Sequence, residues 1–279
     1  MASTTAADDV IYLRPRRGWT DLNLREMWRY RELLYFLTWR DIKVRYKQAA
    51  LGVAWAVIQP LVNIVIFTFI FGGLFGLSKG GVNYPLLSAA GLLPWNLFAS
   101  ALQRSSISLV GNSNLLTKVY FPRLIIPISS VLSGLVDFAI SFLVVLGLMI
   151  YYQAPLTWNL LWLLPLTLLV LITGLAVGLW LSALNVQYRD VQQMVPFLIT
   201  TWMYASPVAY SANLVTGQTM RIIYGLNPMA GVIQSFRWAI MGDPPPGELF
   251  IASIVMVVVL FVTGLFYFRR MEKTFADLV

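Results

Sequence analysis

Four cations stand close together near the start of the chain, directly before a long apolar run. They are Arg40, Lys43, Arg45 and Lys47. The apolar run that follows them carries no charge before Lys79. Arginine and lysine bind phosphate oxygens, and they collect on the cytoplasmic side of membrane spans. The stretch 37–60 therefore predicts the point where the chain enters a bilayer, with its cations at the level of the lipid phosphates.

The residues around this cluster predict an interfacial helix over 22–48. At about 100° per residue, charged side chains fall on one narrow stripe, with aromatic residues on one flank and aliphatic residues on the other. The charged stripe holds Arg29, Glu32, Arg40, Lys43 and Lys47. Rings at headgroup depth and cations toward lipid phosphates are typical of a helix that lies in the interface. A solvated cationic tail is the alternative, but a tail would not need so many aromatic residues.

The composition is that of an integral membrane protein. Of the 279 residues, 58% are hydrophobic and 11% are charged, whereas soluble domains carry about 25% charged residues. Apolar runs of about 20 residues, long enough to cross a hydrocarbon layer of about 30 Å, recur along the chain. We therefore expect an all-α, polytopic membrane protein. Its expected parts are a cytoplasmic N-terminal segment with the interfacial helix (1–50), a six-span transmembrane domain (51–268) and a cytoplasmic tail (269–279).

Six transmembrane helices are expected, and two of their features bear on packing and function. Their approximate bounds are 51–77, 86–110, 124–152, 160–184, 195–210 and 249–268. The first contains the pair Gly72 and Gly76, and the fourth carries Gly174, Gly178 and Ser182. Small residues at four-residue spacing predict a close helix–helix contact. The fifth span is short and is broken by Pro207.

Between the fifth and sixth spans the sequence predicts two short helices. Residues 220–241 are moderately apolar and contain Asn227-Pro228, where Asn can cap a helix and Pro can be its first residue. Irregular backbone at membrane depth survives only where protein or a water-filled path covers it. We therefore expect short re-entrant outer half-helices that line a translocation route.

The distribution of charge predicts the orientation. On the six-span topology, only Lys79, Arg221 and Arg237 among the 20 lysines and arginines lie outside. Both termini are therefore expected to be cytoplasmic. The net charge of +8 thus reports orientation, and no nucleic-acid partner is expected.

The residues that most membrane enzymes need are missing. The chain has no histidine, no cysteine and no G-x-x-x-x-G-K-[ST] loop, so it offers no histidine base, thiol nucleophile or nucleotide cradle. We expect no catalytic residue and no metal site. A membrane glycosyltransferase would need converging acidic groups, and Asp41, Asp137 and Asp190 are too scattered for that.

Asp137 is the one acidic residue that the sequence places well inside a span. An intramembrane carboxylate is a candidate functional group by default. It would be the coupling site if the protein were an ion-coupled carrier. The structural alternatives are that it caps a backbone break or pairs with a cation on a neighbouring helix.

Several motifs together resemble one family. They are LTWRDIKVRYKQAALGVAWAVIQP at 37–60, NSNLLTKVYFPRLIIP at 112–127, NVQYRDVQQMVPFL and SPVAY within 185–210, and the Asn227-Pro228 break. In this order, over 28–270, they are similar to polysaccharide-exporting ABC transporter permeases of the ABC-2 type.

The resemblance implies a homodimer of six-span subunits served by two copies of a separate ATPase. ATP and magnesium would bind to that partner, and no cofactor to this chain. The cargo would be a lipid-linked glycan crossing the bacterial inner membrane: O-antigen first, capsule or teichoic acid next. A small lipid or drug is a further alternative, and an ion-coupled carrier is a weaker one.

The resemblance also implies roles for particular segments. The segment 111–123 would be the coupling element that enters a cleft on the ATPase, and Asn227 and Pro228 would belong to an outer gate. The coupling residues would be Asn114, Leu115, Leu116, Thr117, Lys118 and Tyr120.

Physical chemistry suggests which side chains meet such a cargo. A polyprenyl diphosphate headgroup is anionic and lies at the cytoplasmic headgroup level, where cations can neutralise it. The expected headgroup residues are Arg40, Lys43, Arg45, Lys47 and Arg123. The rings expected to stack along the glycan are Trp95, Phe98, Trp202, Tyr204 and Tyr210. Each ring has an alternative role in an interface belt or in the core, and the cations have one in orientation and anionic-lipid contact.

Overall fold

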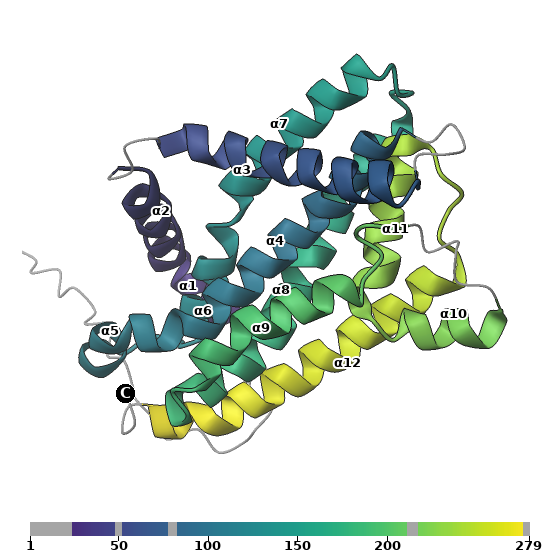
Figure 1. Cartoon of the computed structure of the whole chain (residues 1–279). Helices are drawn as coiled ribbons and strands as arrows, with labels where there is room; N and C mark the ends of the chain where they lie inside the picture. Colours follow the sequence, from purple (N-terminus) through teal and green to yellow (C-terminus); the bar gives the residue numbers. More distant parts are fainter. Residues whose placement is uncertain (1–23, 48–51, 78–82, 211–216, 276–279) are drawn as a thin grey trace, which may run out of the picture.

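The computed structural model describes residues 24–47, 52–77, 83–210 and 217–275. Within these ranges the chain forms helices joined by turns and short irregular segments, without a strand (Figure 1). The helices in chain order are α1 (Leu24–Arg29), α2 (Arg31–Lys47), α3 (Gly52–Phe67), the π-helix η1 (Thr68–Leu74), α4 (Tyr84–Gly111), α5 (Ser113–Lys118), α6 (Ile125–Leu132), α7 (Leu135–Tyr151), the 3-10 helix η2 (Trp158–Trp162), α8 (Leu163–Gln187), α9 (Val191–Tyr204), α10 (Gln218–Gly225), α11 (Pro228–Met241), α12 (Glu248–Met271) and the 3-10 helix η4 (Glu272–Thr274). The expected all-α class is confirmed.

Five helical stretches in the described ranges are long and apolar enough to cross a membrane. They are Ala54–Leu74, Tyr84–Gly111, Ile125–Tyr151, Trp158–Gln187 and Glu248–Thr274. Each of them overlaps one of the spans expected from the sequence. The fifth expected span corresponds to α9, and six crossings stay a prediction.

The helix predicted over 22–48 is observed wherever the chain is described. Between α1 and α2 the backbone bonding continues through Tyr30, whose N–H donates to the carbonyl of Glu26 at 3.2 Å. The aromatic flank is open, because Trp28 and Tyr35 are each 71% exposed, while Leu37 on the aliphatic flank is buried. One packed face beside an open aromatic face is what an interfacial helix requires.

The two glycines of the first span have different roles. A Cβ on Gly72 would lie 3.0 Å from the ring of Tyr84, so this glycine lets η1 approach α4 closely. Gly76 lies beyond η1 and has a φ of 68°, a conformation that glycine adopts without steric cost. The prediction that both glycines form one packing face was therefore wrong for Gly76, which ends the helix instead.

Helix α4 is the centre of the fold. It packs against α3, α6, α7, α8, α9 and α11, and nearly all of its N-terminal half is buried. Pro85 stands in its first turn, after Asn83 at the N-cap, where proline is preorganised for a helix. Pro94 lies inside α4 without ending it.

The glycine face of α8 makes the closest of these contacts. A Cβ on Gly174 would lie 2.6 Å from Cβ of Ala101, and one on Gly178 would lie 2.4 Å from Cβ of Ser105. Ser182 on the same face is fully buried. The packed helix face predicted from the four-residue spacing is confirmed.

The segment after α8 is irregular near Pro207, where the sequence predicted a break. α9 has 14 residues and extends about 21 Å, less than the roughly 30 Å of a hydrocarbon layer. It ends at Tyr204, before Pro207, and residues 205–210 form turns. α10 and α11 are two short helices that meet at Asn227-Pro228, as predicted. Their depth in the membrane stays a prediction.

Replacing Gly178 with valine tests the contact between α4 and α8. The new side chain would overlap Ser105, and overpacking a tight contact costs about 1–3 kcal/mol. We expect a lower midpoint of thermal unfolding in detergent. Gly147→Val is the matched control, since nothing lies within 4 Å of a Cβ at that exposed position of α7. Equal midpoints for the two variants would contradict the argument.

Candidate functional site

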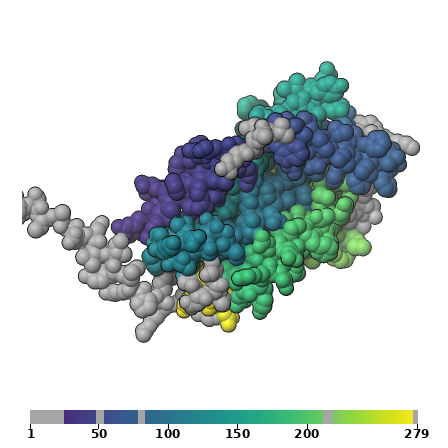
Figure 2. Space-filling view, turned by 60° about the vertical axis from the view of Figure 1, so that its left-hand side comes forward, coloured from purple at the N-terminus to yellow at the C-terminus, as the bar shows by residue number. Residues whose placement is uncertain are grey.

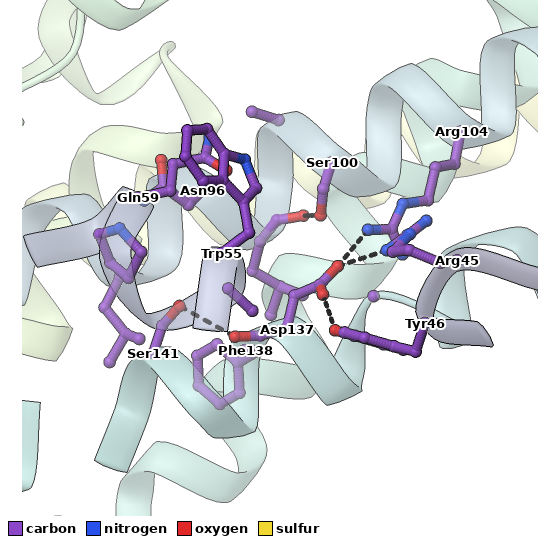
Figure 3. Close-up of a pocket in the computed structure, with 16 residues that line it drawn as sticks. Arg45, Tyr46, Trp55, Gln59, Asn96, Ser100, Arg104, Asp137, Phe138 and Ser141 are labelled. Atoms are coloured by element: carbon purple, nitrogen blue, oxygen red, sulfur yellow. Dashed lines mark hydrogen bonds and ion pairs between the residues drawn. The ribbon is translucent and has the colours of Figure 1, made fainter. Parts of the chain in front are cut away.

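An ion-pair cluster joins α2, α4 and α7. Asp137 lies in the first turn of α7 and forms ion pairs with Arg45 of α2 and Arg104 of α4. Tyr46 of α2 donates a hydrogen bond to the same carboxylate. Arg104 also donates to Oγ of Ser133 at 3.0 Å. Figure 3 shows the three partners converging on one carboxylate, so the cluster ties the interfacial helix to two spans.

The cluster bears on the structural interpretations of Asp137. Pairing with a cation on a neighbouring helix is confirmed, because two guanidinium groups hold the carboxylate. Burial, together with the hydrogen bond to Asp137, raises the pKa of Tyr46 to about 12. The phenol therefore remains a proton donor to the carboxylate at neutral pH. The sequence missed Arg104 and Tyr46 as partners, although a lone arginine inside an apolar span is itself a signal.

A cavity of about 670 Å³ lies beside this cluster, between α3, α4 and α7. Its wall combines the ion-pair cluster with mostly apolar side chains. The lining includes Arg45, Tyr46, Trp55, Ala56, Pro60, Leu93, Leu97, Arg104, Asp137 and Phe138. Gln59 and Asn96 also line it and lie away from the arginines in Figure 3. Cavities of about 300–1,000 Å³ are typical of small-molecule sites.

A second cavity of about 680 Å³ lies on the other side of the same arginines. Its wall is more polar and includes Arg40, Asp41, Asn112 and Gln192 besides Arg45 and Arg104. Arg40 pairs with Asp41 at 2.9 Å and donates to Oδ1 of Asn112 at 2.8 Å. Asn112 lies between α4 and α5, so the hydrogen bond from Arg40 connects the interfacial helix to the junction of these two helices.

The structure divides the predicted headgroup cations. Lys43 and Lys47 are exposed on α2, whereas Arg40 and Arg45 line the second cavity. Arg123 instead contacts residues that follow α12. It donates to the backbone carbonyl of Glu272 and lies over the ring of Phe275, 5.9 Å from the centroid.

Helix α5 presents a polar surface at one end of the molecule. This end carries α1, α2, α5 and the C-terminal turn of α12, and we call it the inner end (Figures 1 and 2). Asn114, Thr117, Lys118 and Tyr120 are exposed there, and Leu115 is half-buried. Leu116 is buried in the apolar cluster under α5. The first four can therefore meet a partner, while Leu116 anchors the helix.

At the opposite end, Asn227 is a hub of four hydrogen bonds. Its Oδ1 caps α11 by accepting from the N–H of Met229 at 3.0 Å, and it accepts from Nε1 of Trp202 at 3.0 Å. Its Nδ2 donates to the carbonyl of Ala205 at 3.1 Å and to Oγ of Ser206 at 2.9 Å. The predicted cap is confirmed, and it also fixes the end of α9.

Two side chains donate hydrogen bonds to the backbone carbonyls of the turn after Ser206, and the sequence did not predict either contact. Arg237 of α11, fully buried, donates to the carbonyls of Val208 at 2.8 Å and Tyr210 at 2.7 Å. Tyr84 of α4 donates to the carbonyl of Ala209 at 2.6 Å. Arg237 lies in the second of the two short helices predicted within 220–241, its burial was not foreseen, and its predicted position on the outer side stays a prediction.

The predicted glycan-path rings lie in different surroundings. Trp95 and Phe98 are buried in the core, and Phe98 packs edge-on against Trp202 with centroids 5.2 Å apart. The hydroxyl of Tyr210 bonds to that of Tyr224 at 2.8 Å. Tyr204 is 66% exposed. In this conformation Tyr204 is the most open of the five rings, and stacking on a glycan stays a prediction for all of them.

Comparison with protein families gives a match that runs from α2 to α11 and ends before α12. Residues 32–241 match the family described as ABC-2 type transporter. The chain belongs to this family. Membership implies association with an ATPase partner, and with the five apolar helices it makes this ABC-2 subunit a multi-pass membrane protein.

Curated relatives of this ABC-2 subunit carry names from polysaccharide export. It is 32% identical over 257 residues to the O-antigen export system permease protein RfbA of Myxococcus xanthus, covering 90% of this chain and 96% of the relative. It is 31% identical to RfbA of Klebsiella pneumoniae, covering 89% and 95%. It is 24% identical to the polysialic acid transport protein KpsM of Escherichia coli, covering 84% and 91%.

Replacing Asn227 with alanine tests the hub of this ABC-2 subunit. Losing a cap costs about 0.5–2 kcal/mol, and leaving the indole N–H of Trp202 unpaired adds about 1–3 kcal/mol. We expect a clear drop in the thermal unfolding midpoint in detergent. Asn114→Ala makes the same change at an exposed position of α5 and should leave the midpoint unchanged. A mild effect at both positions would rule out the hub.

Proposed function

We propose that this chain is the membrane subunit of an ABC exporter for a lipid-linked polysaccharide. The cargo proposed first is O-antigen on a polyprenyl diphosphate carrier. The observation that carries the proposal is the similarity, over nearly the full length of both chains, to proteins named as O-antigen export permeases. Export would run from the cytoplasm to the outer face of the bacterial inner membrane.

The working unit would be a homodimer of this chain with two copies of an ABC ATPase. ATP and magnesium would bind to the ATPase, and this subunit would carry out no chemical step. α5 is the proposed contact, because its polar side chains are exposed at the inner end while Leu116 holds it to the body. The bond from Arg40 to Asn112 supports joint movement of α5 and α2.

The proposed topology has six crossings and cytoplasmic termini. α9 together with the turn 205–210 would make the fifth crossing, since Arg237 and Tyr84 satisfy the carbonyls of that turn and irregular backbone needs such cover. The cations of α2 and the pair Arg269 and Arg270 at the end of α12 would face the cytoplasm.

The proposed headgroup contact lies on α2. Lys43 and Lys47 are exposed beside the arginines of the second cavity, and cations at this level attract anionic phosphates. α10 and α11 would form the outer gate around Asn227 and Pro228, because their junction is the point where an irregular segment meets two short helices.

Deletion of the gene in its native host tests the proposed function. We expect full-length, lipid-linked polymer to accumulate on the cytoplasmic side while the surface glycan is lost, because synthesis continues without export. Gel analysis of surface and intracellular glycan measures both, and a plasmid copy of the gene should restore the surface polymer. Unchanged surface glycan without accumulation would exclude polysaccharide export by this chain.

Capsule export is the second candidate, favoured by the similarity to KpsM proteins. The deletion separates the two, because the polymer that disappears from the surface identifies the cargo. Loss of a capsule with intact O-antigen would assign this chain to capsule export.

Replacing Tyr120 with alanine together with Lys118 with glutamate tests the coupling role of α5. Both side chains are exposed, so the fold should persist while the surface for the ATPase changes in shape and charge. We expect co-purification with the ATPase and export to fall at least tenfold, at a normal level of inserted protein. Trp158→Ala removes an exposed ring of η2, which packs against α8 and α11, and serves as control. Normal co-purification of the double variant would exclude α5 as the contact.

A further inference from the structure

Arg45 and Arg104 form a boundary between two cavities of different character. Both arginines line the cavity between α3, α4 and α7, and both also line the polar cavity beside Arg40 and Asn112. The first cavity continues away from them along mostly apolar side chains. An amphiphile with an anionic head has this same arrangement, with charge at one end and an apolar chain beyond it.

The charges at the boundary leave room for an anion. Two guanidinium groups share one carboxylate, that of Asp137, so the cluster carries one net positive charge. Arg104 is only 17% exposed in its side chain, and a charge removed from water gains much from a second counter-ion. A phosphate can take two parallel bonds from a guanidinium, as a carboxylate does.

We propose that Arg45 and Arg104 bind the phosphate of a single-chain amphiphile whose first units lie in the cavity between α3, α4 and α7. Asp137 is then an internal counter-ion, which holds both arginines in place when the site is empty and competes with the phosphate when it is filled. The proposal rests on the proposed function, which supplies a ligand of this class: the polyprenyl phosphate end of the carrier.

The cavity is large enough for the first units of one chain. Its volume of about 670 Å³ is several times the roughly 150 Å³ of an engineered cavity that holds benzene. Asn96 lies two turns of α4 from Arg104, about 12 Å along the helix axis. The wall between them, with Leu97, Phe138 and the small polar Ser100, is therefore long enough for the start of a chain. Trp55 at the wall is 56% exposed, so the rest of the chain can leave on that side of α3.

The proposal predicts opposite effects for two charge substitutions. Asp137→Asn removes the competing anion and should tighten binding of polyprenyl phosphate several-fold. Arg104→Gln leaves the cluster neutral and should weaken binding at least tenfold. Ala56→Trp, which fills the cavity without changing charge, should abolish binding. If the ion pairs only stabilised the fold and bound no ligand, the two substitutions would not change binding of polyprenyl phosphate in opposite directions.

The experiment uses the purified full-length chain in phosphatidylcholine nanodiscs, titrated with undecaprenyl phosphate and followed by native mass spectrometry and thermal shift. Arg25→Gln and Glu248→Gln, exposed positions outside both cavities, repeat the two charge changes and should leave binding unaltered. Phosphatidylglycerol as competitor should displace the probe poorly, because it brings two chains. If Asp137→Asn fails to fold, Arg45→Gln takes its place in the series and should weaken binding.

Several results would overturn the proposal. The first is that Asp137→Asn, Arg104→Gln and the unchanged protein bind undecaprenyl phosphate equally well. The second is that phosphatidylglycerol displaces the probe as well as unlabelled undecaprenyl phosphate does. The third is that Ala56→Trp binds the probe as tightly as the unchanged protein. If Asp137→Asn does not fold, undiminished binding by Arg45→Gln has the same meaning. Because this assay needs neither glycan nor ATPase, such a failure can occur while gene deletion still abolishes surface polymer. In that case only the proposed site is wrong.

Discussion

The close approach of α4 and α8 is the contact on which the rest of the subunit depends. In a bilayer, lipid tails are as apolar as leucine, so helices gain little by burying apolar surface against each other and depend on tight packing. Gly174 and Gly178 provide it, since any side chain there would overlap Ala101 or Ser105. α4 becomes the central helix as a result, and most of the other helices pack around it.

Two polar side chains near opposite ends of α4 connect this tightly packed helix to its neighbours. Arg104 near its inner end shares Asp137 with the interfacial helix, and Tyr84 in its first turn bonds to the carbonyl of Ala209. In an apolar medium a polar group without a partner costs several kcal/mol. Each of these bonds therefore fixes a neighbouring element relative to α4: α2 at the inner end and the turn after α9 at the other.

Local patterns predicted local structure well. The glycine face of α8 and the Asn227-Pro228 junction depend on neighbours within a few residues, and both were observed. The helix predicted around the cations of α2 was observed as well, with its aromatic side chains exposed. The fifth span was predicted to be short and broken by Pro207, and α9 ends just before that residue, at Tyr204.

Contacts between distant segments were beyond reach of the sequence. Arg45, Arg104 and Asp137 come from three helices, and no spacing rule joins them. Burial of Trp95 was equally hidden, because a ring in a span can face lipid or core. Arg237 fits a loop by charge alone, and only the fold reveals the carbonyls that it satisfies. Family resemblance supplied the overall plan but not these partners.

The hydrogen bonds donated by Arg237 also constrain the order in which this part of the chain can fold during synthesis. The carbonyls of Val208 and Tyr210 leave the ribosome about thirty residues before the arginine that binds them. Until α11 has been synthesised, the carbonyls of Val208 and Tyr210 lack this donor. The turn after α9 can therefore reach its final hydrogen-bonding pattern only once α11 has been made.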